Sequence, residues 1–297
     1  MAKKKNLETV RQEIREATKQ EAPAPAFDWK KILTRTGLIV VAVWALCIAI
    51  YSVQKSYLWL IVPAVLTIAV IGAFLWMRRL LDKQKALGAI LETADSKEGR
   101  AEAIEKLGRE FKADDAQAIL ARAQLEAQDD PRKALATLES VRLDKVMAPM
   151  AAQVRAMRAM LHLTIGETDK ARVLADLLDL GKQQDNKMRA MFATVAGEAW
   201  ARTGMGQKAK DTLELFDPED AAHAELRPQM WRARAFAYAA TGDTRSMKHA
   251  LRRLGAVNPH LLGMFVNQKR IHPLLEREAK QMVMKSGLVQ KQVQRMR

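Results

Sequence analysis

The chain has a single cysteine, Cys47, among its 297 residues, so neither a disulfide framework nor a cysteine-based metal site can form within one chain. Glycine and proline are scarce, at 14 and 9 residues, and no stretch after residue 77 has the alternating pattern of a β-strand. The five histidines are widely spaced and none of them forms an H-x-x-x-H pair. These absences predict an all-α chain with no metal site and no cofactor.

Sequence motifs of common enzyme classes are also missing. The chain has no G-x-x-x-x-G-K-[ST] phosphate loop and no G-x-S-x-G nucleophile turn. Gly204, Gly206 and Lys208 weakly suggest phosphate binding, but this segment aligns with two other turns of a repeat described below. We therefore expect a protein that is not an enzyme, with no catalytic residues and no small-molecule substrate.

Two uncharged apolar runs are present near the N-terminus, at Gly37–Val53 and Tyr57–Met77. Each is close to the roughly 20 residues that a helix needs to cross the hydrocarbon core of a bilayer. A signal peptide followed by one span is disfavoured, because 36 residues precede the first run and no A-x-A-like site follows it. A buried soluble helix pair is disfavoured because the first run has no polar face. The sequence predicts a transmembrane hairpin at 37–77.

Basic residues flank the two runs, whereas the turn between them contains only Lys55. The positive-inside rule then places both termini in the cytoplasm, in a multi-pass protein of a bacterial inner membrane. Neither run contains an ionisable residue, which disfavours an ion or proton path. The residues expected at the membrane interface are Trp29, Lys30, Lys31, Trp59, Trp76, Arg78 and Arg79.

Within the runs, small residues recur four positions apart. Ala45 and Ala49 form one pair, and Ala69 and Ala73 form another. Such pairs let helices approach closely in a membrane, so we expect them where the two spans meet. Trp44 lies away from the span ends and is expected to face lipid or the other helix.

The net charge of +15 is concentrated at the chain ends, with +4 over residues 1–36 and +6 over residues 265–297. Basic ends on a membrane protein favour contact with anionic lipid head groups over nucleic acid. Within the arm, 6–19 is expected to form a short amphipathic helix, with Leu7, Val10, Ile14 and Ala17 at helical spacing. Residues 27–33 have the composition of an interfacial segment, although a plain tether remains an alternative.

A helical repeat follows the hairpin. Segments DDPRKALATL, GETDKARVLA, GMGQKAKDTL and GDTRSMKHAL begin at residues 129, 166, 204 and 242. Each is a turn followed by an apolar helix, and each follows another apolar helix, at 115–127, 149–164, 187–202 and 228–240. One such pair cannot bury its apolar face alone, whereas stacked pairs share a core. The aligned small or Met positions are Ala134, Ala171, Ala209 and Met247, at spacings of 37, 38 and 38.

Over residues 115–260 this pattern resembles the tetratricopeptide repeat family. The third pair matches at Gly197, Trp200 and Ala209, and the fourth at Trp231, Tyr238, Leu251, Leu254 and Pro259. The first two pairs depart from the family, with His162 at a Tyr position and Asp129 at a turn glycine, and the period exceeds 34. The resemblance implies an α-solenoid of about four to five helix pairs. It also implies a peptide-binding groove lined by Gln153, Met160, Met191, Arg202, Arg232 and Phe236.

The sequence thus divides into a basic arm (1–36), the hairpin (37–77), a repeat domain (78–284) and a basic tail (285–297). We expect a membrane-anchored scaffold or adaptor that binds other proteins. The alternatives are a binder of lipid or nucleic acid acting through the basic tails, and a non-catalytic subunit of a membrane enzyme or transport complex. A solvated or core role for the six groove residues also stays open, because a one-residue error of register would move them all.

Overall fold

The structure is a computed structural model that describes residues 29–55, 57–94, 96–267 and 271–285. Helices dominate these ranges and no strand occurs within them, which confirms the all-α prediction for the described chain. The described residues form two compact units that divide between Leu107 and Gly108. The division lies 30 residues later than the boundary expected after Met77. Most of the arm (1–28) and the tail from 286 to 297 lie outside the described residues.

The first unit is built around two long helices, α2 (Trp29–Gln54) and α3 (Leu58–Glu92), followed by α4 (Lys97–Glu110). Lys55, in the turn, has a left-handed φ of 51° and its N–H donates to the carbonyl of Tyr51 at 2.8 Å. A left-handed residue at this place ends a helix by satisfying one of its last carbonyls. α3 then runs well past Met77, because 78–92 contains mostly good helix formers and no proline.

The contact between α2 and α3 includes a hydrogen bond inside the apolar runs. Trp44 Nε1 donates to Thr67 Oγ1 at 3.1 Å, and this hydroxyl donates to the carbonyl of Pro63 at 2.7 Å. Trp44 therefore faces the other helix. Cys47 and Pro63 are buried. The alanine pairs that we expected at the contact, Ala45 with Ala49 and Ala69 with Ala73, are all exposed instead.

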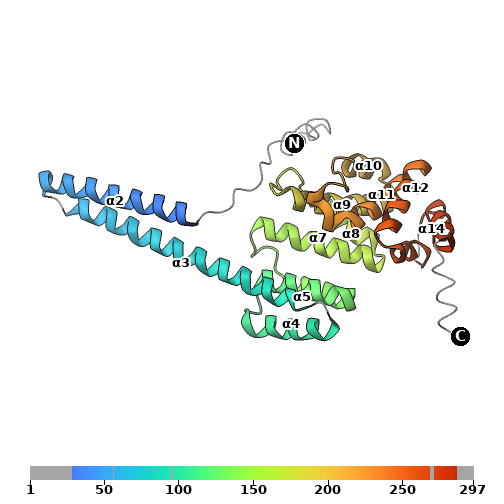
Figure 1. Cartoon of the computed structure of the whole chain (residues 1–297), viewed down its shortest axis with the longest axis horizontal. Helices are drawn as coiled ribbons and strands as arrows, with labels where there is room; N and C mark the ends of the chain where they lie inside the picture. Colours follow the sequence, from blue (N-terminus) through green and yellow to red (C-terminus); the bar gives the residue numbers. More distant parts are fainter. Residues whose placement is uncertain (1–28, 56, 95, 268–270, 286–297) are drawn as a thin grey trace. The chain divides into compact units, whose positions relative to one another are not determined.

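The second unit consists of consecutive helix pairs (Figure 1). From α5 to α12, every helix contacts the next one along the chain, both within a pair and between pairs. The first helices of successive pairs also contact each other: α5 contacts α7, α7 contacts α9, and α9 contacts α11. The pairs are α5 (Ala116–Asp129) with α6 (Pro131–Glu139), α7 (Ala148–Ile165) with α8 (Thr168–Ala175), α9 (Asn186–Arg202) with α10 (Gly206–Leu213), and α11 (Arg227–Ala240) with α12 (Thr244–Val257).

The turns inside the last three pairs repeat one backbone feature. Gly166, Gly204 and Gly242 have φ of 86°, 87° and 74°, a region that favours glycine. In the first pair the chain turns without glycine: Asp130 accepts from the N–H groups of Arg132 and Lys133 and caps α6. The repeat-aligned positions in the second helices, Ala134, Ala171, Ala209 and Met247, are each 0% exposed.

Small residues also recur where the first helix of each pair packs. Ala121, Ala159, Gly197 and Ala235 follow one another at steps of 38 residues and all are buried. At Gly197 a Cβ would lie 2.7 Å from Leu213 Cγ, so α9 and α10 approach too closely for a larger residue. The spacing between the two helices of the third pair is therefore set by backbone approach as well as by side-chain volume.

Two arginines tie successive pairs together: Arg234 is buried and Arg158 is half-buried. Arg234 Nη2 on α11 donates to the carbonyl of Leu213 at 2.6 Å and to that of Phe216, beyond the end of α10. Two pairs earlier, Arg158 on α7 donates in the same way to the carbonyls of Leu138 and Val141 after α6. The Leu138 and Leu213 carbonyls also accept from the N–H groups of Val141 and Phe216, and the cation suits the negative end of each helix dipole.

The unit closes with short helices. η1 (Ala221–Leu226) precedes α11, while η2 (Pro259–Gly263), α13 (Met264–Asn267) and α14 (Pro273–Lys285) follow α12. Phe265 and Leu275, each 0% exposed, extend the core of the fourth pair, and the Phe265 ring lies 5.2 Å from that of Phe236. The C-terminal helices thereby cover the apolar face that the last pair would otherwise expose.

Candidate functional site

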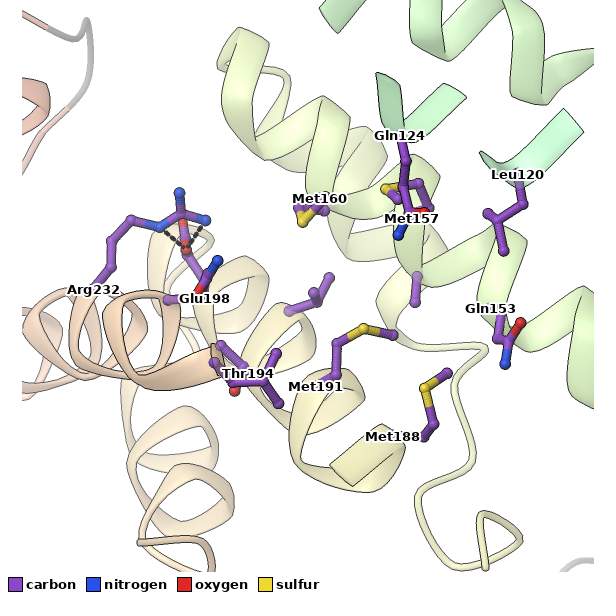
Figure 2. Close-up of a pocket in the computed structure, with 14 residues that line it drawn as sticks. Leu120, Gln124, Gln153, Met157, Met160, Met188, Met191, Thr194, Glu198 and Arg232 are labelled. Carbon is purple, nitrogen blue, oxygen red and sulfur yellow. Dashed lines mark hydrogen bonds and ion pairs between the residues drawn. The ribbon is translucent and has the colours of Figure 1, made fainter. Parts of the chain in front are cut away.

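A pocket of about 370 Å³ opens in the second unit, on side chains from the first helix of each pair and from η1. Its volume is at the low end of the roughly 300–1,000 Å³ of ligand sites. Figure 2 shows the side chains converging from α7 and α9 in particular. It is lined by Leu120, Gln124, Gln153, Ala156, Met157, Met160, Met188, Met191, Thr194, Val195, Glu198, Leu226, Gln229 and Arg232.

Four of the eight apolar lining residues are methionines, and we call this cavity the methionine pocket. Met157 and Met160 come from α7, and Met188 and Met191 from α9. All four are half-buried: one side packs on the core and the other faces the cavity. The unbranched thioether side chain adapts its shape readily, so such a wall can accept apolar groups of several shapes.

The polar groups at the pocket fall into two kinds. Gln124, Gln153 and Gln229 contribute amides, which can both donate and accept hydrogen bonds. Glu198 and Arg232 contribute the charges, and they bind one another. Arg232 Nε donates to Glu198 Oε2 at 2.7 Å, and Arg232 Nη2 lies 2.7 Å from the same oxygen.

Glu198 is held from a second side as well. Its side chain is 2% exposed, and its Oε1 accepts a hydrogen bond of 3.2 Å from Arg202 Nη1. Burial lowers the pKa of the Arg202 guanidinium, whereas the Glu198 carboxylate opposes this shift. A guanidinium stays charged in proteins, so the carboxylate compensates two cations at the wall of the pocket.

Four of the six expected groove residues, Gln153, Met160, Met191 and Arg232, line the methionine pocket. The prediction is wrong for Phe236, which is 5% exposed and lies in the core. It is also wrong for Arg202, whose side chain is 4% exposed, donates to the carbonyl of Leu163 at 3.0 Å and lies over the Phe236 ring at 4.9 Å. The expected role of Arg232 changes too, because its guanidinium binds a carboxylate of this chain.

Several lining residues were absent from the expected set although the sequence contains a signal for them. Met157 stands three residues before Met160, and Met188 stands three before Met191, so each pair shares one helix face. Glu198 follows Met191 by seven residues, again on that face. Nothing in the sequence indicates that Glu198 also holds Arg232, since this contact depends on the packing of α11 against α9.

A second functional surface lies on the first unit. Thr34–Ser52 and Ile61–Leu91 are long and apolar enough to cross a membrane. In the described part of the chain, 17 of 23 exposed large hydrophobic side chains fall between Leu38 and Met77. Soluble proteins seldom expose a continuous apolar patch of more than a few hundred Å². The apolar surface of α2 and α3 therefore requires lipid or another cover.

Among the residues expected at the membrane interface, Trp59 lies just before the apolar stretch Ile61–Leu91, whereas Trp76, Arg78 and Arg79 lie within it. Trp29, Lys30 and Lys31 are in the first turn of α2, and only their backbone is described. On α3, Trp76 is 64% exposed. Arg78 and Arg79 are also exposed, while Trp59 is half-buried.

No protein-family model matches the chain, and no curated protein and no solved structure is similar to it. Among the described residues, no group of three or more His, Cys, Asp or Glu side chains is placed to hold a metal ion. The tetratricopeptide resemblance stays a prediction, and the functional argument rests on the pocket and the apolar hairpin.

Proposed function

We propose that this protein is a membrane-anchored adaptor. Its α2–α3 hairpin spans a membrane, and its helix-pair unit, a tetratricopeptide-like solenoid, binds partner proteins in the methionine pocket. The observation that carries the proposal is a pocket whose lining combines four methionines, three glutamine amides and two charges that are paired to one another. Such a wall suits apolar side chains better than a charged small molecule.

The chemistry of the pocket also narrows the class of partner. A phosphopeptide or a free carboxylate needs a cation to bind it, and Arg232 is already bound to Glu198 through two nitrogens. The partner is therefore a helix or peptide that inserts uncharged apolar side chains, while its backbone or polar groups bond to the glutamine amides. Anchoring to a membrane raises the effective concentration of such a partner there.

The basic residues beside the two apolar runs support a cytoplasmic location for the helix-pair unit. Arg78, Arg79, Lys83 and Lys85 follow the second run, and only Lys55 lies in the turn. By the positive-inside rule, the helix-pair unit is cytoplasmic and the turn lies on the other side. The same basic residues would contact anionic lipid at the surface, an auxiliary interaction worth about 1 kcal/mol per residue.

Crosslinking and co-purification from native membranes tests the adaptor role. The pocket variant combines Met157→Ala and Met191→Ala, which remove apolar wall without adding charge. The matched control combines Val173→Ala on α8 and Leu177→Ala just after it, at two exposed residues outside the pocket. We expect a defined partner with the unaltered chain and the control, and its loss with the pocket variant. Equal recovery with both variants, or loss only in the control, would move the binding site away from the pocket.

A further inference from the structure

The methionine pocket disfavours a charged segment and suits an apolar one. Its charged groups, Glu198 and Arg232, compensate each other, so a charged segment would lose hydration there without gaining a counter-ion. Its four methionines and Leu120 offer apolar contact over about 370 Å³. This space suits the side chains of one short apolar stripe, as presented by two or three turns of an amphipathic helix.

The chain itself carries such a stripe. In the segment NLETVRQEIREATK (6–19), Leu7, Val10 and Ile14 recur at spacings of three and four residues and carry no charge. On a helix these side chains span roughly 10 Å at 1.5 Å per residue. Six charged residues cover the rest of the segment, so its apolar stripe is narrow. The stripe matches the pocket in polarity and in extent.

The segment is also part of the same molecule. It is joined to α2 by residues 20–28, which include the sequence EAPAPA and so favour an extended chain of about 3.1 Å per residue. A ligand on a linker that spans the two sites binds as if at a local concentration of about a millimolar, which strengthens the weak contacts of one narrow stripe.

We propose that the apolar stripe of residues 6–19 occupies the methionine pocket of its own chain, and that a partner must displace it. This inference rests on the proposed function, since it takes the pocket to be a helix-binding site. The adaptor is then self-regulated. A partner whose apolar stripe binds the pocket more tightly than residues 6–19 displaces them, and a partner that binds less tightly is excluded by this competition. Release of the segment, rather than movement of the pocket, makes the site accessible.

Disulfide mapping in the purified full chain tests this proposal without any partner. In a Cys47→Ala background, Ile14→Cys is combined with Met191→Cys, and the control combines Gln12→Cys with the same Met191→Cys. Residue 12 lies on the opposite face of a helix from the stripe. A disulfide needs Cβ atoms about 3.5–4.5 Å apart, so oxidation reports close approach.

We expect an intramolecular disulfide in the Ile14 variant at a rate at least about tenfold that of the Gln12 control, and independent of protein concentration. Equal rates, or no crosslink in either variant, would overturn the proposal. A crosslink between chains would overturn it in favour of a second copy as the occupant.

The two proposals can fail separately. Leu7→Gln with Ile14→Gln removes the stripe and leaves the pocket intact, so partner recovery from native membranes should rise several-fold if the segment competes. Unchanged recovery would contradict the internal competition while leaving the adaptor role in place. An intramolecular disulfide in a chain that captures no partner would support the contact and count against the adaptor role.

Discussion

At the scale of single residues, Glu198 is the buried carboxylate that compensates the charges of two arginines. Its carboxylate is buried between Arg202, whose side chain is 4% exposed, and Arg232, whose side chain is 18% exposed. A buried cation that loses its counter-ion costs far more than a surface pair contributes. The carboxylate therefore stabilises the wall of the methionine pocket as well as fixing Arg232.

We expect Glu198→Gln to lower the free energy of unfolding of the helix-pair unit by about 3–5 kcal/mol, because two buried or half-buried guanidinium groups lose their charge partner. Chemical denaturation of the full chain, followed by circular dichroism, measures the change. The control is Asp144→Asn, which removes an exposed pair with Arg142 at 3.4 Å and should change stability by less than about 0.5 kcal/mol. Equal effects of the two variants would refute the account of Glu198.

The sequence predicts helix faces better than it predicts where long side chains point. The family resemblance placed Met160 and Met191 in a groove, and both line the pocket. Arg202 lies at the last residue of α9, where its long side chain turns back to the carbonyl of Leu163 and to the Phe236 ring. These contacts come from α7 and α11, so no local pattern indicates them.

At the scale of elements, the helix pairs are joined by specific polar contacts as well as by the apolar core. Asp243 caps α12 by accepting from the Ser246 N–H at 3.1 Å, and it also accepts from Lys210 Nζ of α10 at 2.9 Å. The Asp243 side chain thus caps the N-terminus of α12 and also links the third helix pair to the fourth. The hydrogen bonds from Lys210 and from Ser246 lower the pKa of the Asp243 carboxyl.

This lowered pKa gives a pH dependence of known sign. A carboxyl group whose pKa is lower in the folded than in the unfolded chain stabilises the folded state. Its contribution is complete at pH values above its ordinary pKa of about 4. This contribution decreases as the pH falls below that value, and it is lost once the pH has fallen past the lower pKa of the folded chain. Asp243→Asn keeps a good cap but removes the charge, so its stability should fall less steeply than that of the unaltered chain below about pH 4. Denaturation at a series of pH values measures the difference, and parallel curves would contradict it.

The element boundaries show where sequence patterns stop being informative. The turn glycines of the last three pairs could be located because each is followed by an apolar helix of the same phase. The length of α3 could not, since hydropathy falls at Arg78 while helix propensity continues to Glu92. The end of a span and the end of a helix are set by different properties, which is why α3 continues past Met77 to Glu92.

At the scale of the whole molecule, the account joins an apolar hairpin to a partner-binding unit in one chain. If the hairpin spans the membrane, a cysteine in its turn and a cysteine on the helix-pair unit must lie on opposite sides. In a Cys47→Ala background, Lys55→Cys should react with an impermeant maleimide from outside intact cells, and Leu177→Cys only after the membrane is opened. Labelling of both sites from the same side would exclude the two-span topology.

The central claim is that the methionine pocket holds another helix when the chain is in its membrane. Site-specific photo-crosslinking tests it most directly, with the crosslinking residue at Met191 in the pocket or at Val173 on exposed α8. The account predicts that Met191 in native membranes crosslinks to a defined partner or to residues 6–19, and that Val173 gives neither product. No product from Met191, or the same products from both positions, would contradict it.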